Sequence, residues 1–274
     1  MNKLDYYNGK NEVPEGTFRI SASSISKFFD HTRQWWGENL LGEEGFNSST
    51  ASVLGTCVHY VAEQYSKTRK ITDADKAEIE AYIVQEAEKN PEVEADIVRE
   101  QYKPMAEELV RNFLVSNMPT NSEDFMFEEI LPGIGVGGSC DYYDEKTGTV
   151  GDYKTTGALN APTYISKAYK WQLLVYAWLY RKQDLPVNRI KIIYVTRNTV
   201  GRVSEKTGKP MKDYPSTVTT ITEEITDEDL DFIESIINQI AHSVQLWKTQ
   251  PELHWALAQD FRLFKPTKPN PFKD

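Results

Sequence analysis

The segment GDYKTT, residues 151–156, places an aspartate and a lysine, Asp152 and Lys154, two positions apart. On a β-strand, side chains at i and i+2 point to the same face, so the carboxylate and the ammonium would stand side by side. A surface salt bridge of little energetic value is one explanation of this spacing. A metal ligand beside a lysine that handles protons is another, and the pair alone does not decide between them.

A second aspartate precedes this segment across a turn. In CDYYDEKTGTVGDYK, residues 140–154, the turn signal is EKTG, and loops of two or four residues both pair Asp144 with Thr149. The same register makes Asp141 face Asp152, with Cβ atoms about 4.5–5.5 Å apart on one face of the hairpin. Loops of three or five residues would shift the register and separate the two carboxylates.

Two carboxylates that face each other destabilise a hairpin unless something compensates their charge. A divalent cation between them would do so, and hard oxygen ligands favour Mg2+ or Mn2+ over zinc. Lys154 shares the face of Asp152 and could orient or deprotonate a water molecule. This combination is chemistry suited to the hydrolysis of phosphodiester bonds.

The first half of the chain predicts mainly helices. A short strand near residue 19 is followed by a helix capped at about Ser24. Residues 47–68 form a predicted helix with apolar residues at helical period, and residues 71–100 and 103–118 continue as helices. The apolar faces are Leu54, Val58, Ala62 and Tyr65 in the first of these helices, and Met105, Leu109 and Phe113 in the last.

The second half predicts strands as well. Segments 124–130, 133–145 and 149–156 are three successive strands of a meander, separated by glycine and turn residues. A long helix over 161–183 has Pro162 near its start, and a buried strand over 189–198 follows. A basic loop or ribbon over 201–216, a strand over 217–225 and a helix capped by Thr226 complete the chain. This order predicts the α/β class, with a mixed central sheet flanked by helices.

Composition supports a folded protein, and the length is enough for one large domain or two small ones. The chain has 274 residues, 39% hydrophobic, with 15 Tyr, 11 Phe and 6 Trp, which excludes wholesale disorder. No apolar run is long enough for a membrane span, and residues 1–16 lack the apolar stretch of a signal peptide. Cys57 and Cys140 show no metal-ligand spacing, so each is expected to be a small buried residue in a reducing cytosol.

The charge distribution is uneven. The net charge is −10, but residues 153–214 contain 12 Lys and Arg against 3 Asp and Glu. Residues 71–100 contain 10 acidic and 3 basic residues. Such polarity can steer a polyanion to one side of a protein, although a solvated basic face explains the composition equally well.

Four motifs in order resemble the PD-(D/E)XK nuclease superfamily, and within it the RecB-type branch that includes lambda-type exonucleases. They run from Gly55 to about Tyr176, and the Ser-rich segment ISASSISKFF is a weaker further match. The motifs are GTCVH with Gly55 and His59, GGSCD ending at Asp141, GDYKTTG with Asp152 and Lys154, and QLLVY with Gln172 and Tyr176.

The resemblance implies a role for each residue. Asp141, Asp152 and the backbone carbonyl of Tyr153 would hold the metal, with His59 as a nitrogen ligand. Lys154 would position or activate the attacking water and stabilise developing charge. Gln172 and Tyr176 would orient the site and touch the DNA backbone, from one face of a helix.

Three glutamates are weaker candidates. Glu63 lies one helical turn from His59, where it could support that imidazole or simply be solvated. Glu128 and Glu129 lie in the first predicted strand of the meander, and one of them could be an extra metal ligand. Strand alternation does not say which, and both could be surface residues.

The resemblance further implies a restriction-endonuclease-like core and an exonuclease that uses Mg2+ or Mn2+ on double- or single-stranded DNA. Residues 1–274 would form one nuclease domain, with a peripheral helical subregion over about 66–118 and the nuclease core over about 119–248. Several members of the branch hold an iron–sulfur cluster with cysteines that lie mostly near the C-terminus. No cysteine follows Cys140 here, so no cluster is expected.

No phosphate-binding loop of a helicase occurs either, which predicts a nuclease without its own motor. Its size suggests a phage-type recombination enzyme in the cytoplasm of a bacterial or phage-infected cell. A single-strand annealing or recombination protein would be a possible partner, and no membrane partner is expected. The basic residues 167–212 would track phosphates.

Two other functions are compatible with the same residues. The first is a non-catalytic module on the same fold that binds DNA ends or a recombination partner. Paired carboxylates facing phosphate argue against it, because they weaken binding of a polyanion. The second is a hydrolase of small phosphate esters, against which the long basic stretch favours a polymeric substrate.

Overall fold

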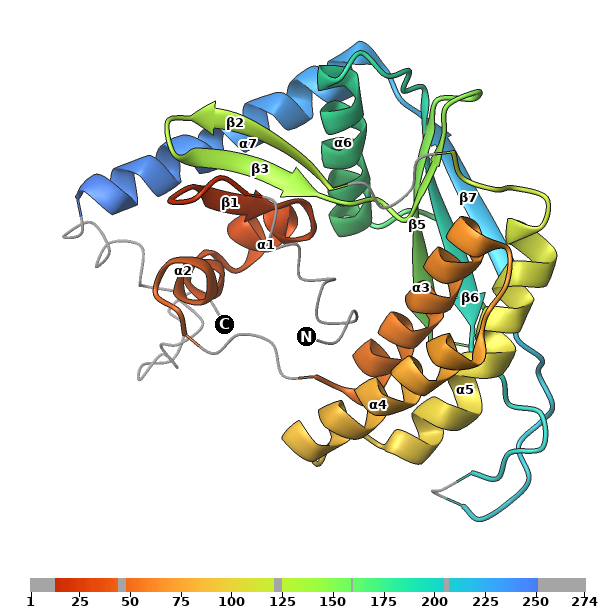
Figure 1. Ribbon diagram of the computed structural model, residues 1–274. Coiled ribbons are helices and arrows are strands. Elements are labelled where there is room, and N and C mark those ends of the chain that lie inside the picture. Colours follow the sequence, from red (N-terminus) through yellow and green to blue (C-terminus); the bar gives the residue numbers. More distant parts are fainter. Residues whose placement is uncertain (1–12, 44–47, 121–124, 159, 205–206, 251–274) are drawn as a thin grey trace, which may run out of the picture.

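The computed structural model describes residues 13–43, 48–120, 125–158, 160–204 and 207–250 (Figure 1). The chain forms two mixed sheets that lie side by side, with helices packed against both. The predicted α/β class with helices flanking mixed β-structure is therefore confirmed, but the single mixed central sheet that was expected is divided into two mixed sheets. None of the helices in the described ranges has the length and apolar character needed to cross a membrane.

The N-terminal segment begins with strand β1 (Phe18–Ser21), a 3-10 turn over 22–24, helix α1 (Ile25–Asp30) and helix α2 (Thr32–Leu40). The predicted cap at Ser24 is correct in position but not in bonding, since its hydroxyl donates to the Ser21 carbonyl at 2.9 Å. The predicted single helix is broken at His31, whose extended φ of −145° separates α1 from α2.

The first sheet has three strands in the order β1-β3-β2. Strand β2 (Met126–Leu131) pairs antiparallel with β3 (Ile134–Gly138), and β1 pairs parallel with β3. The expectation of one continuous strand over 133–145 is wrong. The chain leaves the first sheet after Gly138 and enters the second sheet at β4 (Tyr142–Asp144), so the predicted three-strand meander does not form.

The second sheet has the order β4-β5-β6-β7. Strand β5 (Thr149–Thr156) pairs antiparallel with β4 and parallel with β6 (Arg189–Thr196), and β7 (Val218–Glu224) pairs antiparallel with β6. A parallel pair needs a crossover connection. Helix α6 (Lys167–Lys182) provides it. It begins later than predicted, because the Ser166 side chain caps it and Pro162 lies in the preceding loop.

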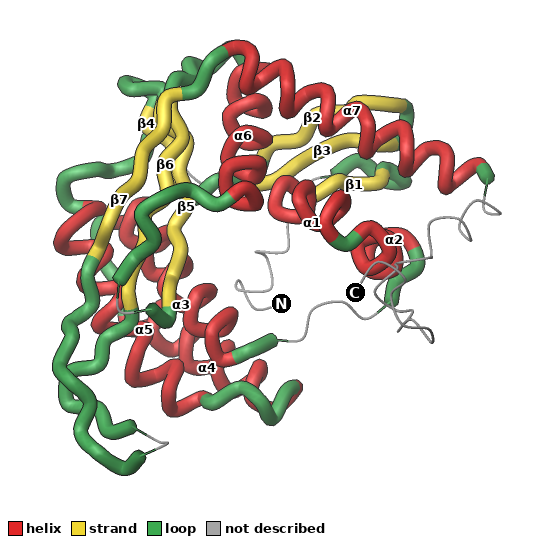
Figure 2. Tube along the Cα trace, turned by 180° about the vertical axis from the view of Figure 1, so that it is seen from behind, coloured by secondary structure: helices red, strands yellow, loops and turns green. Residues whose placement is uncertain are grey.

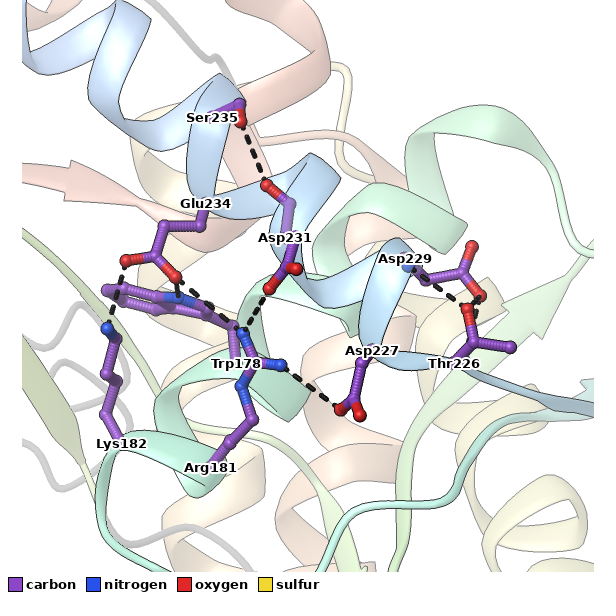
Figure 3. A network of polar contacts seen from close by, with 9 residues as sticks. All are labelled: Trp178, Arg181, Lys182, Thr226, Asp227, Asp229, Asp231, Glu234 and Ser235. Carbon is purple, nitrogen blue, oxygen red and sulfur yellow. Dashed lines mark hydrogen bonds and ion pairs between the residues drawn. The ribbon is translucent and has the colours of Figure 1, made fainter.

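Helix α6 is fixed in place by α7 (Asp227–Thr249), the last helix in the described ranges. The Trp178 indole donates to Glu234 at 3.0 Å, and Arg181 forms ion pairs with Asp231 at 3.2 Å and with Asp227 at 3.4 Å (Figure 3). The predicted Thr226 cap of α7 is confirmed, since its hydroxyl accepts from the backbone N–H of the third helical residue. These contacts orient the helix that faces the second sheet.

The opposite face of the second sheet is covered by helices α3 (Thr50–Thr68) and α5 (Ala95–Leu109), with a π-helical turn over 110–114. Helix α4 (Asp73–Lys89) packs on α3 and α5 in a separate apolar cluster (Figure 2). The predicted apolar faces are confirmed: Val58, Ala62, Met105, Leu109 and Phe113 are buried, and Leu54 and Tyr65 pack against them. Cys57 and Cys140 are buried free thiols, as expected.

Candidate active site

The hairpin of β4 and β5 has the predicted register. Asp144 pairs with Thr149 and Tyr142 pairs with Gly151, across the EKTG turn. Asp141 comes one residue before this ladder, and Asp152 comes one residue after it on the other strand. Continuing the register by one residue places Asp141 opposite Asp152, at the point where the pairing of β4 with β5 ends.

Asp141 is held by contacts from two other elements. Its Oδ2 accepts a hydrogen bond from the Tyr153 backbone N–H at 2.8 Å, and its Oδ1 lies 3.3 Å from His59 Nδ1. Burial would raise the pKa of Asp141, but the His59 imidazole and Lys154 outweigh burial and lower it. Burial likewise would lower the pKa of His59, but the Asp141 carboxylate raises it overall.

Asp152 and Lys154 form a buried ion pair. Lys154 Nζ lies 2.5 Å from Asp152 Oδ2, and only 6% of the aspartate side chain is exposed, so the surface salt bridge considered from the sequence is excluded. Burial raises the pKa of Asp152 to about 6, against the opposing effect of Lys154. Burial would lower the pKa of Lys154, but the Asp152 carboxylate raises it, so the ammonium stays charged at neutral pH.

Helix α6 contributes two side chains from one face. The Gln172 amide donates to Asp152 Oδ1 at 3.4 Å and to the Tyr176 hydroxyl at 3.1 Å. Tyr176 is 6% exposed and lies against the end of β3. A Cβ atom on Gly138 would stand 2.8 Å from its ring, so only glycine allows this approach. Gln172 thus links Asp152 on β5 to Tyr176 on helix α6.

Helix α3 brings His59 to the site through a close contact at Gly55. A Cβ atom at Gly55 would lie 3.2 Å from Thr155 Oγ1, tighter than most such contacts, so the glycine lets α3 approach β5. His59 follows one helical turn after Gly55, so its side chain lies on the same face of α3, which is the face toward β5. Its ring also meets the Tyr153 ring edge-on, at 6.0 Å between centroids.

The three weaker candidates lie elsewhere or have other contacts. Glu63 forms an ion pair with Lys67 on α3. Glu128 and Glu129 lie on β2, which belongs to the first sheet, whereas Asp152 lies in the second. Glu129 is exposed and accepts from the Gly133 backbone N–H at the β2–β3 turn, at 2.8 Å.

A further aromatic residue, which the four motifs do not include, contacts the site. The ring of Tyr169 on α6 faces the Lys154 ammonium, with Nζ 4.9 Å from the ring centroid. A cation over an aromatic face is attracted by the ring quadrupole. The signal in the sequence is the spacing, because Tyr169 is three residues before Gln172 and so shares its helix face.

The donor atoms fit a hard divalent cation by their chemistry. Two carboxylates and an imidazole lie close together in one buried place, and the nearest cationic group to Asp152 Oδ2 among the described residues is the Lys154 ammonium at 2.5 Å. In the part of the chain that the structure describes, no three such side chains stand in ready metal-binding geometry. Instead Lys154 pairs with Asp152, and His59 contacts Asp141.

Comparisons with known proteins agree with this arrangement. The sequence profile of the PD-(D/E)XK nuclease superfamily matches residues 19–249. No curated protein sequence matches the chain. Among solved structures, a protein from Eubacterium rectale described as an exonuclease has a TM-score of 0.52 at 16% identity, over 91% of this chain and 86% of that one. This similarity supports the fold.

Two further solved structures are more distant. A phage-related exonuclease from Haemophilus somnus 129PT gives a TM-score of 0.45 at 13% identity, over 82% of this chain and 93% of that one. An alkaline exonuclease from Laribacter hongkongensis gives 0.42 at 10% identity, over 95% and 99% of the two chains.

Proposed function

The chain belongs to the PD-(D/E)XK nuclease superfamily, and from this premise we propose that it is a Mg2+- or Mn2+-dependent exonuclease that acts on DNA. The observation that carries the proposal is the buried cluster of Asp141, Asp152 and Lys154, with His59 on one side and Gln172 on the other. The solved structure from Eubacterium rectale with a TM-score of 0.52 is described as an exonuclease, which supports the exonuclease class.

Asp141 and Asp152 would hold the metal, with His59 as a nitrogen ligand. The Tyr153 carbonyl is the fourth candidate, because the N–H and C=O of one strand residue point to the same side and this N–H already reaches Asp141. A divalent cation bound there supplies Lewis-acid activation of water and of the phosphate.

The remaining chemistry belongs to side chains of the protein. Lys154 carries its charge beside the acidic pair, where it would orient the attacking water and stabilise negative charge that develops on phosphate oxygens. Gln172 holds Asp152 Oδ1, and Tyr176 holds Gln172, so the carboxylate keeps its orientation. The Tyr169 ring contacts the Lys154 ammonium and limits its movement.

Burial argues for catalysis rather than for binding alone. A binding module would gain nothing from an aspartate that is 4% exposed and has its pKa raised to about 6, because a charged carboxylate there opposes both folding and phosphate binding. Such perturbed groups are concentrated at catalytic sites.

The decisive experiment is a digestion series with Mg2+ or Mn2+ on end-labelled DNA, single- and double-stranded, linear and circular. Asp152→Ala and Lys154→Ala should each abolish cleavage while the protein stays folded, and DNA binding in Ca2+ should survive the lysine change. Release of mononucleotides from linear but not circular DNA identifies an exonuclease. Full activity of either variant would refute the assignment.

The wider setting is also part of the proposal. We infer a single nuclease domain that works on DNA in the cytoplasm of a bacterial or phage-infected cell, alongside a single-strand annealing or recombination protein. The two free, buried cysteines are compatible with a reducing compartment. Copurification of an annealing protein encoded by the same source would test the partner.

A further inference from the structure

The sheet hairpin of β6 and β7 continues beyond the sheet as a ribbon, defined here as residues 197–204 and 207–216. The backbone N–H of Thr199 donates to the Tyr214 carbonyl at 2.9 Å, that of Met211 to Arg202 at 2.8 Å, and that of Ser204 to Lys209 at 2.8 Å. These pairs keep the register of Val195 with Val218 in the sheet. The ribbon is thus a paired arm, and its first strand contains a turn over residues 199–202, where Gly201 has a φ of 72°.

The arm leaves the sheet at the edge that carries the active site. Strands β5 and β6 are parallel, so both end at the same edge, where the Arg197 backbone N–H donates to the Thr156 carbonyl at 3.1 Å. Lys154 pairs with Tyr194, so the Arg197 backbone lies about 10 Å further along the strand direction. Residues 197–204 contain a turn over 199–202, so the arm reaches less than the roughly 25 Å that eight fully extended residues would span.

Most described basic residues of the predicted DNA-tracking stretch, 167–212, already form ion pairs within the protein. Among the described residues of 167–212, ion pairs with acidic side chains engage six basic residues: Lys167, Lys170, Arg181, Lys182, Arg189 and Arg202. The basic residues without an acidic partner are the ones whose charge is not already balanced within the protein. On the ribbon, Arg197, Lys209 and Lys212 have no acidic partner within the described ranges, and both lysines are exposed.

Arg197 stands out at the base of the arm. It is half-buried, and its Nε atom is buried without a hydrogen-bond acceptor in the described structure. Continuing the register places Ser216 opposite Arg197, and the Ser216 hydroxyl is also buried without a partner. Opposite residues of an antiparallel pair have neighbouring side chains. Such a hydroxyl can accept from the guanidinium and donate to an anion that the guanidinium binds.

We propose that Arg197 and Ser216 form a phosphate-binding site at the base of the ribbon, and that Lys209 and Lys212 extend it along the backbone of duplex DNA. The inference rests on the proposed DNA nuclease. A guanidinium matches phosphate oxygens in bidentate geometry, and a two-stranded ribbon fits the major groove of a duplex. The arm would hold the duplex beside the strand end that enters the active site.

The test is binding of a 24-base-pair duplex and of a 24-nucleotide single strand in Ca2+, over a range of salt concentrations. Arg197→Gln/Lys209→Gln/Lys212→Gln should lower duplex affinity at least tenfold and reduce the slope of log affinity against log salt by up to about 3. Single-strand affinity should change much less. Arg197→Gln alone should reduce the slope by about 0.9.

The matched control removes the same charge elsewhere. Lys76→Gln/Lys89→Gln/Lys103→Gln replaces exposed lysines of α4 and α5 that pair with acidic residues of their own helices, and it should leave duplex binding unchanged. The proposed role of the arm is refuted if the ribbon variant keeps the wild-type slope of log duplex affinity against log salt. It is also refuted if the control loses as much duplex affinity as the ribbon variant, or if the ribbon variant loses as much affinity for single-stranded DNA as for the duplex. Wild-type protein that neither binds nor cuts DNA would instead refute the proposed function.

Discussion

The ion pair between Lys154 and Asp152 predicts a stability loss that depends on pH when the lysine is removed. Nζ and Oδ2 are 2.5 Å apart, and the two side chains are 20% and 6% exposed. Lys154→Met removes the ammonium but keeps most of the apolar stem. A buried charge left without its partner typically costs about 3–5 kcal/mol of folding free energy.

The sign of the pH dependence follows from Asp152. Burial raises its pKa from 3.8 to about 6, so the folded protein binds this proton more tightly than the unfolded chain does. The stability that this group contributes therefore falls as pH rises through about 6. Without Lys154 the pKa of Asp152 rises further, and at low pH the carboxyl takes up a proton that removes the uncompensated charge. The cost of Lys154→Met should be under about 1 kcal/mol near pH 5.5 and about 3 kcal/mol near pH 8.

Urea denaturation of metal-free protein at both pH values measures this difference. The double variant Asp152→Asn/Lys154→Met removes both charges and should recover most of the stability near pH 8. Ca2+ should stabilise Lys154→Met more than the wild type, because no ammonium then competes for Asp152 Oδ2. A cost independent of pH, or a double variant as unstable as Lys154→Met, would refute the electrostatic reasoning.

Two more predictions test other elements of the site. His59→Gln removes the imidazole that lies 3.3 Å from Asp141 Oδ1, so the Mn2+ concentration for half-maximal activity should rise about tenfold; an unchanged titration would remove His59 from the site. Gly138→Ala forces a Cβ to within 2.8 Å of the Tyr176 ring, so it should cost about 1–3 kcal/mol, lower Tm and reduce kcat. Gly157→Ala, where a Cβ meets nothing within 4 Å, is the matched control for thermal melting and activity.

The register of the β4–β5 hairpin could be predicted from the sequence because local rules determine it. A turn signal fixes which residues pair, and strand alternation then fixes which side chains share a face. The observed pairs Asp144 with Thr149 and Tyr142 with Gly151 follow from those rules once the loop has two or four residues. The helix faces were predictable for the same reason, since a period of 3.6 residues is local information.

The departure of the chain from the first sheet after Gly138 is not local information. Segment 133–145 has the composition of one strand, but the tertiary contact between Gly138 and Tyr176 brings α6 against the chain where β3 ends. The start of α6 was misjudged for a related reason. Pro162 is compatible with a helix start, yet the Ser166 side chain accepts from the Tyr169 N–H and caps the helix there.

This break between the two sheets helps to form the site. Because the β4 ladder stops at Tyr142, the Tyr153 N–H on β5 has no strand partner on that side, and Asp141 Oδ2 accepts its hydrogen bond instead. A carboxylate thus takes the place of a backbone carbonyl at the open edge of β5. A continuous strand over 133–145 would keep Asp141 within the ladder and fill that edge with backbone. The break of the chain between Gly138 and Tyr142, which the periodicity of the sequence does not predict, therefore lets two aspartates and a lysine meet at the edge of the second sheet.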